Sequence, residues 1–253
     1  MDNIDTCQVY RLGVIEYIKA WHLQNQLAAQ IVAGEQPPTL LLLEHSHVYT
    51  FGRRGNAENL LWEQAKLQEQ HVDVHWVDRG GDVTYHGPGQ LVGYPLMPLG
   101  EVSLENGKPR LPQVNYIGYL RNLERVLINA LAELGVPAGQ VTGQTGVWVQ
   151  PEVASRCRHC PPELKQAPSK IASIGVRVDS KGISRHGFAL NVVPDMTYWK
   201  GIIACGLDNQ NQISLEYLLD ETPGMERVIE EVVEAFGEVF GYRMQVAEGI
   251  IQF

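Results

Sequence analysis

The sequence of 253 residues has few cysteines, no excess of positive charge and no long apolar run. No stretch approaches the roughly 20 apolar residues that a helix needs to cross a bilayer, so we expect no membrane partner. The start of the chain has neither a basic region nor an apolar core, which predicts a cytoplasmic protein without a secretion signal. A formal net charge of −9 disfavours nucleic acid as a partner, because phosphate binding needs a basic face.

Four cysteines, at positions 7, 157, 160 and 205, are too few and too unevenly spaced for a disulfide framework. Cytoplasmic surroundings would keep them reduced. Cys157 and Cys160 have the spacing of half a zinc site, but no second pair follows, and a closed tetrahedral site needs four ligands. We therefore expect an exposed thiol pair that is dispensable for activity and stability, in a proline-rich surface loop at residues 150–169.

The hydrophobic pattern predicts one domain over residues 1–253, because no linker-like break interrupts it. Apolar residues at helical spacing favour helices, and shorter apolar or alternating runs favour strands. The expected helices are 14–32, 114–135 and 223–240, and the expected strands are 4–12, 39–44, 72–77, 141–149 and one near the end. Residues 170–178 and 183–193 alternate about a turn at 180–182, which predicts a hairpin.

Two histidines, His45 and His47, follow the buried strand predicted at 39–44. Their spacing suits metal ligation, but no third ligand is near in sequence, and a metal site needs more than two. The sequence therefore favours histidines that hold the loop or line a pocket, and it predicts no metal.

Residues 79–95 hold five of the chain's 25 glycines, interleaved with Arg79, Thr84, His86 and Gln90. Glycine reaches positive φ at little cost and lets a ligand approach the main chain, so this density indicates backbone held close to something. An ordinary glycine-rich hairpin is the alternative. A structural turn does not need an arginine, a histidine and a glutamine beside it, which favours a binding loop.

The pattern Arg-Gly-Gly-x-x-Thr-Tyr-His-x-Pro-Gly-Gln-x-x-x-Tyr-Pro from Arg79 to Pro95 resembles the signature of the lipoyl(octanoyl) transferases. Further similar pieces follow in the family's order. They are Glu44 and His45 with Thr50, Gly52 and Arg53, then residues 170–175, 186–191 and 205–206. The resemblance thus covers roughly residues 40 to 210.

The resemblance implies an α+β fold of the biotin/lipoate ligase type, with one mixed, largely antiparallel sheet, helices packed outside and a smaller sheet. It also implies an acyltransferase that moves an octanoyl group from acyl carrier protein to a lysine of lipoyl domains. The acceptors implied are those of 2-oxoacid dehydrogenases and the glycine cleavage H protein. No cofactor is implied, and the sequence has no phosphate-binding loop of the Gly-x-x-x-x-Gly-Lys type.

The catalytic pair that the resemblance implies is Lys170 and Cys205, with Ala204 where the family usually has proline. A thiol reacts as its thiolate, which a nearby ammonium favours. A solvated Lys170 and a buried, inert Cys205 are the alternatives, because 35 positions separate the two residues in sequence. The segments that match substrate contacts in the family are Arg79, Gly80, Gly81, Asp82, Val83, Thr84, Tyr85 and His86, then Ser173, Ile174 and Gly175, then Gly187, Phe188 and Ala189.

Two other functions fit parts of the sequence. An ATP-dependent lipoate–protein ligase has a similar loop and an essential lysine, but it needs no thiol nucleophile. A scaffold that binds acyl carrier protein without turnover would not need Lys170 and Cys205. Because the chain and acyl carrier proteins are both acidic, we expect a local basic rim of Arg53, Arg54, Arg79 and Arg185 to bind the donor.

Overall fold

The computed structural model describes residues 5–100, 103–105, 108–110, 115–157, 160–204 and 211–247, with only the backbone described at 103–105 and 108–110. Its strands are β1 Thr6–Ile15, β2 Thr39–His45, β3 Val48–Phe51, β4 Asp73–Trp76, β5 Val83–His86, β6 Gln90–Leu96, β7 Ser103–Glu105, β8 Lys108–Arg110, β9 Gly139–Val141, β10 Gln144–Val149, β11 Ser169–Val178, β12 Ser184–Asn191 and β13 Arg243–Val246. The helices are α1 Tyr17–Ala33, α2 Gln64–Glu69, α3 Tyr116–Glu133, α4 Pro151–Ala154, α5 Leu215–Leu218 and α6 Met225–Phe240, with short 3-10 turns at 57–59, 162–165 and 196–201.

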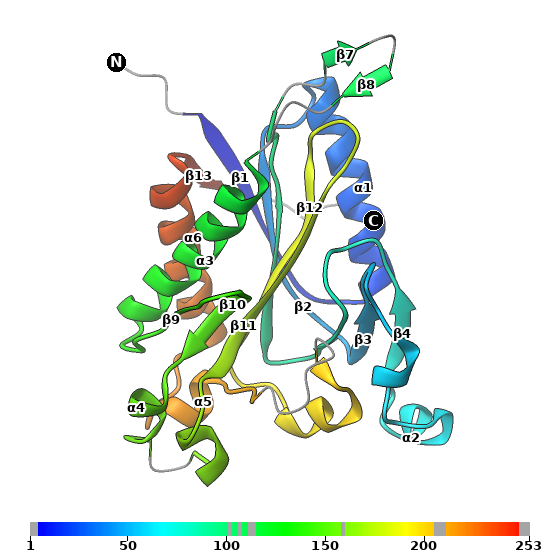
Figure 1. The fold of residues 1–253 in the computed structure, drawn as a ribbon. Helices are drawn as coiled ribbons and strands as arrows, with labels where there is room; N and C mark the ends of the chain where they lie inside the picture. Colours follow the sequence, from blue (N-terminus) through cyan, green and yellow to red (C-terminus); the bar gives the residue numbers. More distant parts are fainter. Residues whose placement is uncertain are drawn as a thin grey trace.

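The main sheet has eight strands in the order β13-β1-β2-β6-β12-β11-β10-β9 (Figure 1). β1 pairs in parallel with both β13 and β2, and every later pair in this order is antiparallel. The expected mixed, largely antiparallel sheet is therefore confirmed. A second sheet of β4, β3 and β5 lies beside it, and β7 and β8 form a small hairpin.

Helices cover both faces of the main sheet (Figure 1). On one face α3 and α6 pack together over a core that includes Leu42, Leu123 and Phe236. On the other face α1 packs its Leu23 and Leu27 against alternate residues of β2 and β6. β2 is buried along nearly its whole length because helices pack on both sides of it.

Glycines end the first and last long helices. Gly34 after α1 and Gly241 after α6 have φ of 72° and 74°, a left-handed conformation that glycine adopts without a Cβ penalty. At the start of α3, the Asn115 side-chain oxygen accepts a hydrogen bond of 2.8 Å from the Gly118 backbone. These local signals explain why the helix boundaries lie close to those expected from sequence.

The segment at 150–169 differs from the expected surface loop. It contains α4 and a 3-10 turn, and Ala154, Cys157, Cys160 and Leu164 join the main hydrophobic core. Cys157 and Cys160 are bonded as a disulfide and are only 7% and 6% exposed. The expectation of an exposed thiol pair was wrong, because one side of this segment faces inward although its prolines prevent a regular period.

The described helices include none that combines the length and the apolar character of a membrane span.

Candidate active site

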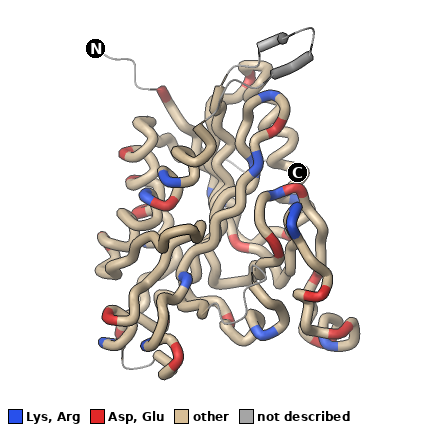
Figure 2. Tube along the Cα trace, in the orientation of Figure 1, with Lys and Arg blue, Asp and Glu red and all other residues tan. Residues whose placement is uncertain are grey.

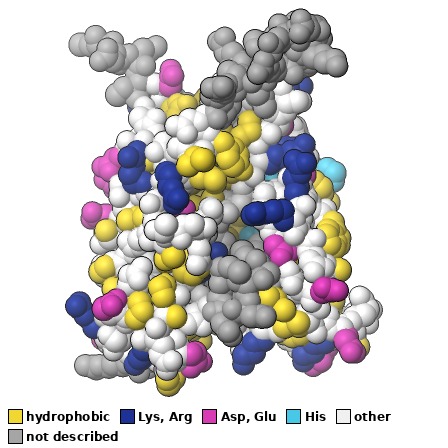
Figure 3. Space-filling view, in the orientation of Figure 1, with side chains coloured by type: hydrophobic (Ala, Val, Ile, Leu, Met, Phe, Trp, Pro, Cys, Tyr) yellow, Lys and Arg dark blue, Asp and Glu magenta, His cyan; other side chains and the backbone are white. Residues whose placement is uncertain are grey.

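A cavity of about 530 Å³ opens between the β11–β12 hairpin, the glycine-rich loop at 79–82 and the first turn of α3. On the face drawn in Figure 3, a hydrophobic patch in the upper half is flanked by Lys and Arg side chains. Figure 2 shows basic residues along the β11–β12 hairpin, whereas acidic residues are spread over the helices and loops. The chain is acidic as a whole, but the cavity is lined by three basic residues, Arg54, Arg79 and Lys170, and one acidic residue, Asp82.

The cavity brings together most of the residues expected to contact substrate. Those lining it are Arg79, Gly80, Gly81, Asp82, Val83, Thr84, His86, Ser173, Ile174, Gly175, Gly187, Phe188 and Ala189, together with Lys170. Tyr85 does not line it. Along a strand successive side chains point to opposite faces, and Tyr85 packs with Tyr49 and Tyr198 in the core of the small sheet.

Lys170 is the second residue of β11 and is only 4% exposed. Its ammonium nitrogen lies 4.6 Å from the centre of the Trp148 ring, a cation–π contact that helps to hold a lysine out of water. Gly146 makes room for this side chain, since a Cβ there would lie 3.3 Å from Lys170 Cε and 2.6 Å from the Ala172 carbonyl oxygen. The alternative of a solvated strand end is excluded for Lys170.

Cys205 lies outside the described residues, as do residues 206–210. The chain on the far side of this gap returns to Lys170. The Lys170 amide donates to the Asn211 carbonyl at 2.8 Å, and the Ile213 amide donates to the Lys170 carbonyl at 3.0 Å. Six residues after Cys205 the chain is therefore paired with the main chain of Lys170, and an extended segment of that length spans at most about 20 Å.

Arg79 fixes the glycine-rich loop. Its guanidinium donates to the Thr50 carbonyl at 2.5 Å, to the Thr50 hydroxyl at 3.0 Å and to the Gly80 carbonyl at 2.9 Å. Gly52 completes this arrangement, because a Cβ on it would lie 2.4 Å from the Gly81 carbonyl oxygen. Arg79 is 7% exposed, so it lines the cavity but does not belong to an exposed basic rim.

The buried wall of the cavity carries four polar rings: Tyr17, His86, Tyr94 and His186. Tyr17 and His86 are stacked, with ring centres 6.1 Å apart. Burial, followed by the charge interaction with His45, holds the pKa of His86 well below its usual value, so this imidazole is neutral at pH 7. Burial also raises the pKa of Tyr94 well above its usual value. These four rings are thus polar but uncharged.

Behind this wall His45 fixes Tyr94. One ring nitrogen of His45 lies 2.8 Å from the Ile15 carbonyl and must donate to it, so the other nitrogen, 2.7 Å away, accepts from the Tyr94 hydroxyl. Burial lowers the pKa of His45 to about 4, which keeps this arrangement neutral. The expectation that His45 holds a loop or lines a pocket is met in part, since it sits behind the lining. No metal-ligand cluster occurs among the residues with described positions.

A chain of amides joins His86 to the segment beside Lys170. His86 Nδ1 donates to the Gln90 side-chain oxygen at 2.8 Å, and the Gln90 amide donates to Asn191 at 2.9 Å. Asn191 in turn donates to the Ile213 carbonyl at 3.1 Å. Every bond in this series is buried, so it ties the His-x-Pro-Gly-Gln segment to the pairing of Ile213 with Lys170.

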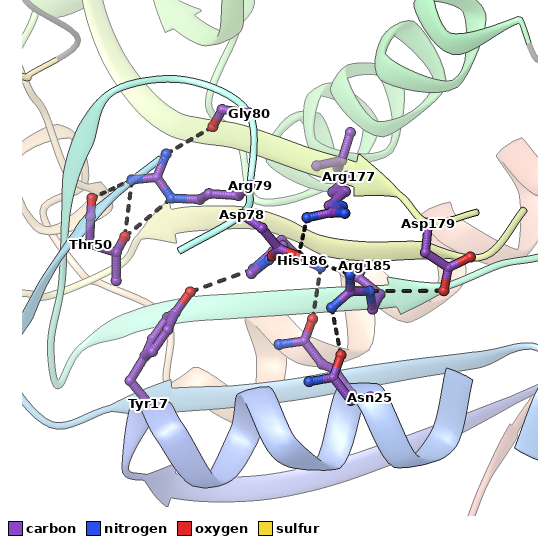
Figure 4. Close-up of polar contacts among 12 residues, drawn as sticks. Tyr17, Asn25, Thr50, Asp78, Arg79, Gly80, Arg177, Asp179, Arg185 and His186 are labelled. Carbon is purple, nitrogen blue, oxygen red and sulfur yellow. Dashed lines mark hydrogen bonds and ion pairs between the residues drawn. The ribbon is translucent and has the colours of Figure 1, made fainter. Parts of the chain in front are cut away.

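A carboxylate, Asp78, organises the opposite side of the wall (Figure 4). It accepts from His186 at 2.6 Å and from Arg185 at 2.9 Å, and it pairs with Arg177. Burial alone would raise the pKa of Asp78, but the hydrogen bond from His186 and the charges of Arg185 and Arg177 hold it well below its usual value. His186 itself has a φ of 56°, so its backbone is in a conformation that non-glycine residues rarely adopt.

The expected basic rim of four arginines was wrong for two of them. Arg185 is 8% exposed and is held by Asp78 and by the Asn25 side chain at 2.5 Å. Of the four arginines expected at the rim, Arg53 and Arg54 are exposed, whereas Arg79 and Arg185 are buried. Sequence reasoning did not separate them, because exposed and buried arginines look alike in sequence.

Sequence reasoning also missed Tyr17, Asp78, Tyr94 and His186 as parts of the site. Asp78 directly precedes the recognised motif, and His186 opens a recognised piece, so their positions gave a usable signal. Tyr17 gave none, because it is the first residue of a helix far from every motif.

Comparison with known proteins agrees with this architecture. Residues 16–237 match the family model described as the lipoyl protein ligase A/B catalytic domain. An octanoyltransferase of Koribacter versatilis is 38% identical over 233 residues, covering 92% of this chain and 84% of the relative. One of Acidobacterium capsulatum is 40% identical over 235 residues, covering 92% and 89%. The structure of a bi-partite lipoate protein ligase from Thermoplasma acidophilum has a TM-score of 0.65 at 14% identity, covering 96% of this chain and 88% of that one.

The family match extends over most of the chain, so the chain belongs to the lipoyl protein ligase A/B catalytic domain family. Its curated relatives over most of both chains are octanoyltransferases, which confirms the class of enzyme expected from the sequence. The structural likeness, at low identity, supports the fold alone. The acyl donor and the acceptor belong to the proposal below.

Proposed function

We propose that this octanoyltransferase moves an octanoyl group from acyl carrier protein to a lysine of lipoyl domains through a thioester on Cys205. The acceptors are the lipoyl domains of 2-oxoacid dehydrogenases and the glycine cleavage H protein, and the reaction opens endogenous protein lipoylation. The observation that carries the proposal is the burial of Lys170 in the cavity lined by the glycine-rich loop and the 173–175 and 187–189 segments. The cytoplasmic location expected from the sequence stays a prediction.

The first half-reaction loads the enzyme. The proton of the Cys205 thiol resides on Lys170 as its ammonium, and the thiolate attacks the thioester carbonyl carbon of the donor. The bond from that carbon to the carrier's sulfur breaks, and the Lys170 ammonium returns the proton to the leaving thiolate. The products are octanoyl-Cys205 and the free carrier thiol.

The second half-reaction forms the amide. The neutral amine of the acceptor lysine attacks the octanoyl-Cys205 carbonyl, Lys170 takes a proton from that nitrogen, and the carbon–sulfur bond breaks. The proton passes to the Cys205 thiolate and restores the thiol. Exchange of one thioester for another is nearly balanced, whereas thioester to amide is strongly downhill, so the sequence of steps needs no ATP.

The cavity supplies apolar surface and a neutral polar wall for these steps. Phe188 and Ala189 of β12 and Ile174 of β11 offer apolar contact for an acyl chain. The backbone at Gly80, Gly81 and Gly175 is close to the cavity, and backbone N–H groups are suited to a developing oxyanion. Neutral His86 and His186 bring no positive charge that would compete with Lys170 for the thiolate.

Intact mass of the full chain after incubation with octanoyl-acyl carrier protein tests the proposal. The wild type should gain one octanoyl group, and Cys205→Ser should gain no thioester. Lys170→Arg keeps a cation that does not release a proton near neutrality, so it should alkylate at Cys205 but transfer poorly to a lipoyl domain. Lys165→Arg, a lysine outside the cavity, is the matched control and should transfer normally.

Two results would overturn parts of the proposal. Transfer that requires ATP and free octanoate would indicate ligase chemistry, and binding of the carrier without acyl transfer would indicate a scaffold. Normal turnover in Lys170→Arg would leave Lys170 as an electrostatic partner without a role in proton transfer.

A further inference from the structure

The disulfide between Cys157 and Cys160 touches the segment that pairs with Lys170. The Tyr217 carbonyl oxygen lies 2.5 Å from the Cys157 sulfur and 3.5 Å from the Cys160 sulfur. Tyr217 belongs to α5, which begins two residues after Ile213. Two cysteines that the proposed transfer does not use therefore contact Tyr217, which lies in the short stretch of residues 211–218 whose first three residues pair with Lys170.

A second contact joins the same two parts of the chain. The Asn211 side chain donates to the Glu163 carbonyl at 3.1 Å, and the Asn211 carbonyl accepts from the Lys170 amide at 2.8 Å. Among the described residues, Gln212 Oε1 and Ser214 Oγ are buried without a hydrogen-bond partner, so these two side-chain atoms do not fix the stretch. Its position depends on its main-chain pairing with Lys170 and on its contacts with the cysteine segment. Bonds to Asn191 and Val192 and the burial of Ile213 and Leu215 in the core also hold it.

The oxidation state of the pair changes what it offers to Tyr217. α5 is a single turn, and the last carbonyls of a helix have no partner within it. Two thiols donate S–H hydrogen bonds to such a carbonyl, whereas a disulfide has no hydrogen to donate. Reduction therefore caps α5, and oxidation leaves the Tyr217 carbonyl facing two sulfur atoms that give it nothing.

The spacing of the pair favours reversible chemistry over a permanent staple. The chain entropy that a disulfide removes grows with the number of residues it encloses, and this one joins positions three apart. Cys-x-x-Cys pairs are a common arrangement in thiol–disulfide exchange. Ser155 and Arg156 beside the pair are exposed, so it lies just beneath the surface.

We propose that Cys157 and Cys160 form a reversible thiol–disulfide site whose reduction caps α5 and steadies residues 211–218 against Lys170. The oxidant is a disulfide of the glutathione or thioredoxin class. One cysteine thiolate attacks it, forming a mixed disulfide and releasing one thiolate; the second cysteine then attacks its neighbour's sulfur and releases the other. Two cysteine thiols lose two protons and two electrons, and the oxidant becomes two thiols.

The activity part of this inference rests on the proposed transfer reaction. Matched variants distinguish a failure of the redox inference from a failure of the proposed transfer. Cys157→Ser/Cys160→Ser cannot form the disulfide but keeps hydroxyl donors for Tyr217. Cys157→Ala/Cys160→Ala has neither the bond nor a donor. Both variants retain Cys205, so any direct effect of glutathione on that residue is common to all three proteins.

The full chain is equilibrated in reduced and in oxidised glutathione, and the thiols are trapped and counted by mass. The pair should be a dithiol in the first buffer and a disulfide in the second. Reduced wild type should transfer roughly fivefold faster than oxidised wild type, the change that one modest hydrogen bond represents. The serine variant should match the reduced rate in both buffers, and the alanine variant should match the oxidised rate.

Hydrogen exchange supplies a readout that does not depend on catalysis. The Lys170 and Ile213 amides should exchange faster in the oxidised protein, because both donate to bonds between β11 and residues 211–213. A pair that stays in one state in both buffers, or exchange that does not differ between the states, would overturn the inference. A redox difference in activity that persists in the serine variant would assign the effect to Cys205 instead. No transfer by any protein, with the exchange difference present, would refute the proposed function alone.

Discussion

Asp78 and His186 are joined by a hydrogen bond of 2.6 Å between the carboxylate and His186 Nε2. Burial lowers the pKa of His186, and Asp78 opposes that shift, so the ring is neutral at pH 7 with its Nε2 proton directed to the carboxylate. Its Nδ1 then faces the Tyr17 hydroxyl at 3.5 Å as an acceptor. One half-buried carboxylate therefore sets the tautomer of a ring in the cavity wall and also holds Arg177 and Arg185.

Asp78→Asn should lower stability and change the titration of His186. The variant leaves the Arg185 and Arg177 charges without their counter-ion, and because Asp78 is partly exposed we expect a loss of about 2 kcal/mol in the free energy of unfolding. The pKa of His186, followed by NMR, should fall further because the group that raises it has gone. Asp179→Asn is the control, since Asp179 lies 4.0 Å from Arg185 and does not touch His186. An unchanged His186 titration would contradict the assigned tautomer.

His45→Gln should reduce the loss in the free energy of unfolding that the protein shows as the pH falls. A histidine that is fully buried and neutral has a folded pKa of about 4 against an ordinary value of 6.5, so the unfolded chain binds the proton first as pH falls. Stability from this residue is complete above pH 6.5 and is lost between pH 6.5 and pH 4, by about 3 kcal/mol at most. Denaturant melts across this range should show a smaller loss in His45→Gln than in the wild type. The exposed His22→Gln is the control and should follow the wild type.

Gly146→Ala should disturb Lys170 directly. A Cβ at position 146 would lie 2.6 Å from the Ala172 carbonyl oxygen, in addition to the strain of a φ of 123°. We expect a cost of about 3 kcal/mol in stability and a clear loss of transfer, measured by melts and by the octanoyl assay. Gly143→Ala is a close control: it has a φ of 77° and lines the cavity, but nothing lies within 4 Å of its added Cβ. It should cost about 1 kcal/mol. Equal losses in the two variants would mean that space beside Lys170 is not the cause.

Arg54→Glu should slow transfer from acyl carrier protein at low salt. Arg54 is exposed and lines the cavity, so it is well placed to meet an acidic donor. Charge reversal should reduce the second-order rate roughly tenfold at low ionic strength and less at high salt. Arg243→Glu, on β13 at the edge of the sheet order, is the control for net charge. A loss shared by both variants would point to overall charge and not to a local contact.

Local patterns predicted much of the fold. The hairpin of β11 and β12 and the helix α3 lay where the sequence indicated, because a turn and a helical period are set by neighbouring residues. The parallel pairing of β1 with β2 and β13 was not predicted, since it depends on which distant segments meet. Ile117 shows the same limit: it is an apolar residue in the first turn of α3, but it is 71% exposed, which its type and position in the helix do not indicate.

Part of the candidate site was likewise predicted from the sequence, and part was not. The motif located the cavity, and Lys170 proved to be buried in it. The sequence did not indicate which way the side chains point. Arg79 and Arg185 turn inward to Thr50 and Asp78. Tyr85 points away from the side of the strand that Thr84 and His86 share with the cavity. The burial of Cys157 and Cys160 depends on their packing in the main core, which no spacing in the sequence predicts.

The pairing of β1 with β13 has a consequence for synthesis on the ribosome. Among the described strands of the main sheet β1 is translated first, and its outer edge is covered by residues 243–246, which are translated after all the others. Throughout elongation that edge presents unpaired N–H and C=O groups, which are a template for pairing with another chain. A nascent chain that stalls before Arg243 would therefore be a substrate for chaperones, even with every residue of the cavity already made.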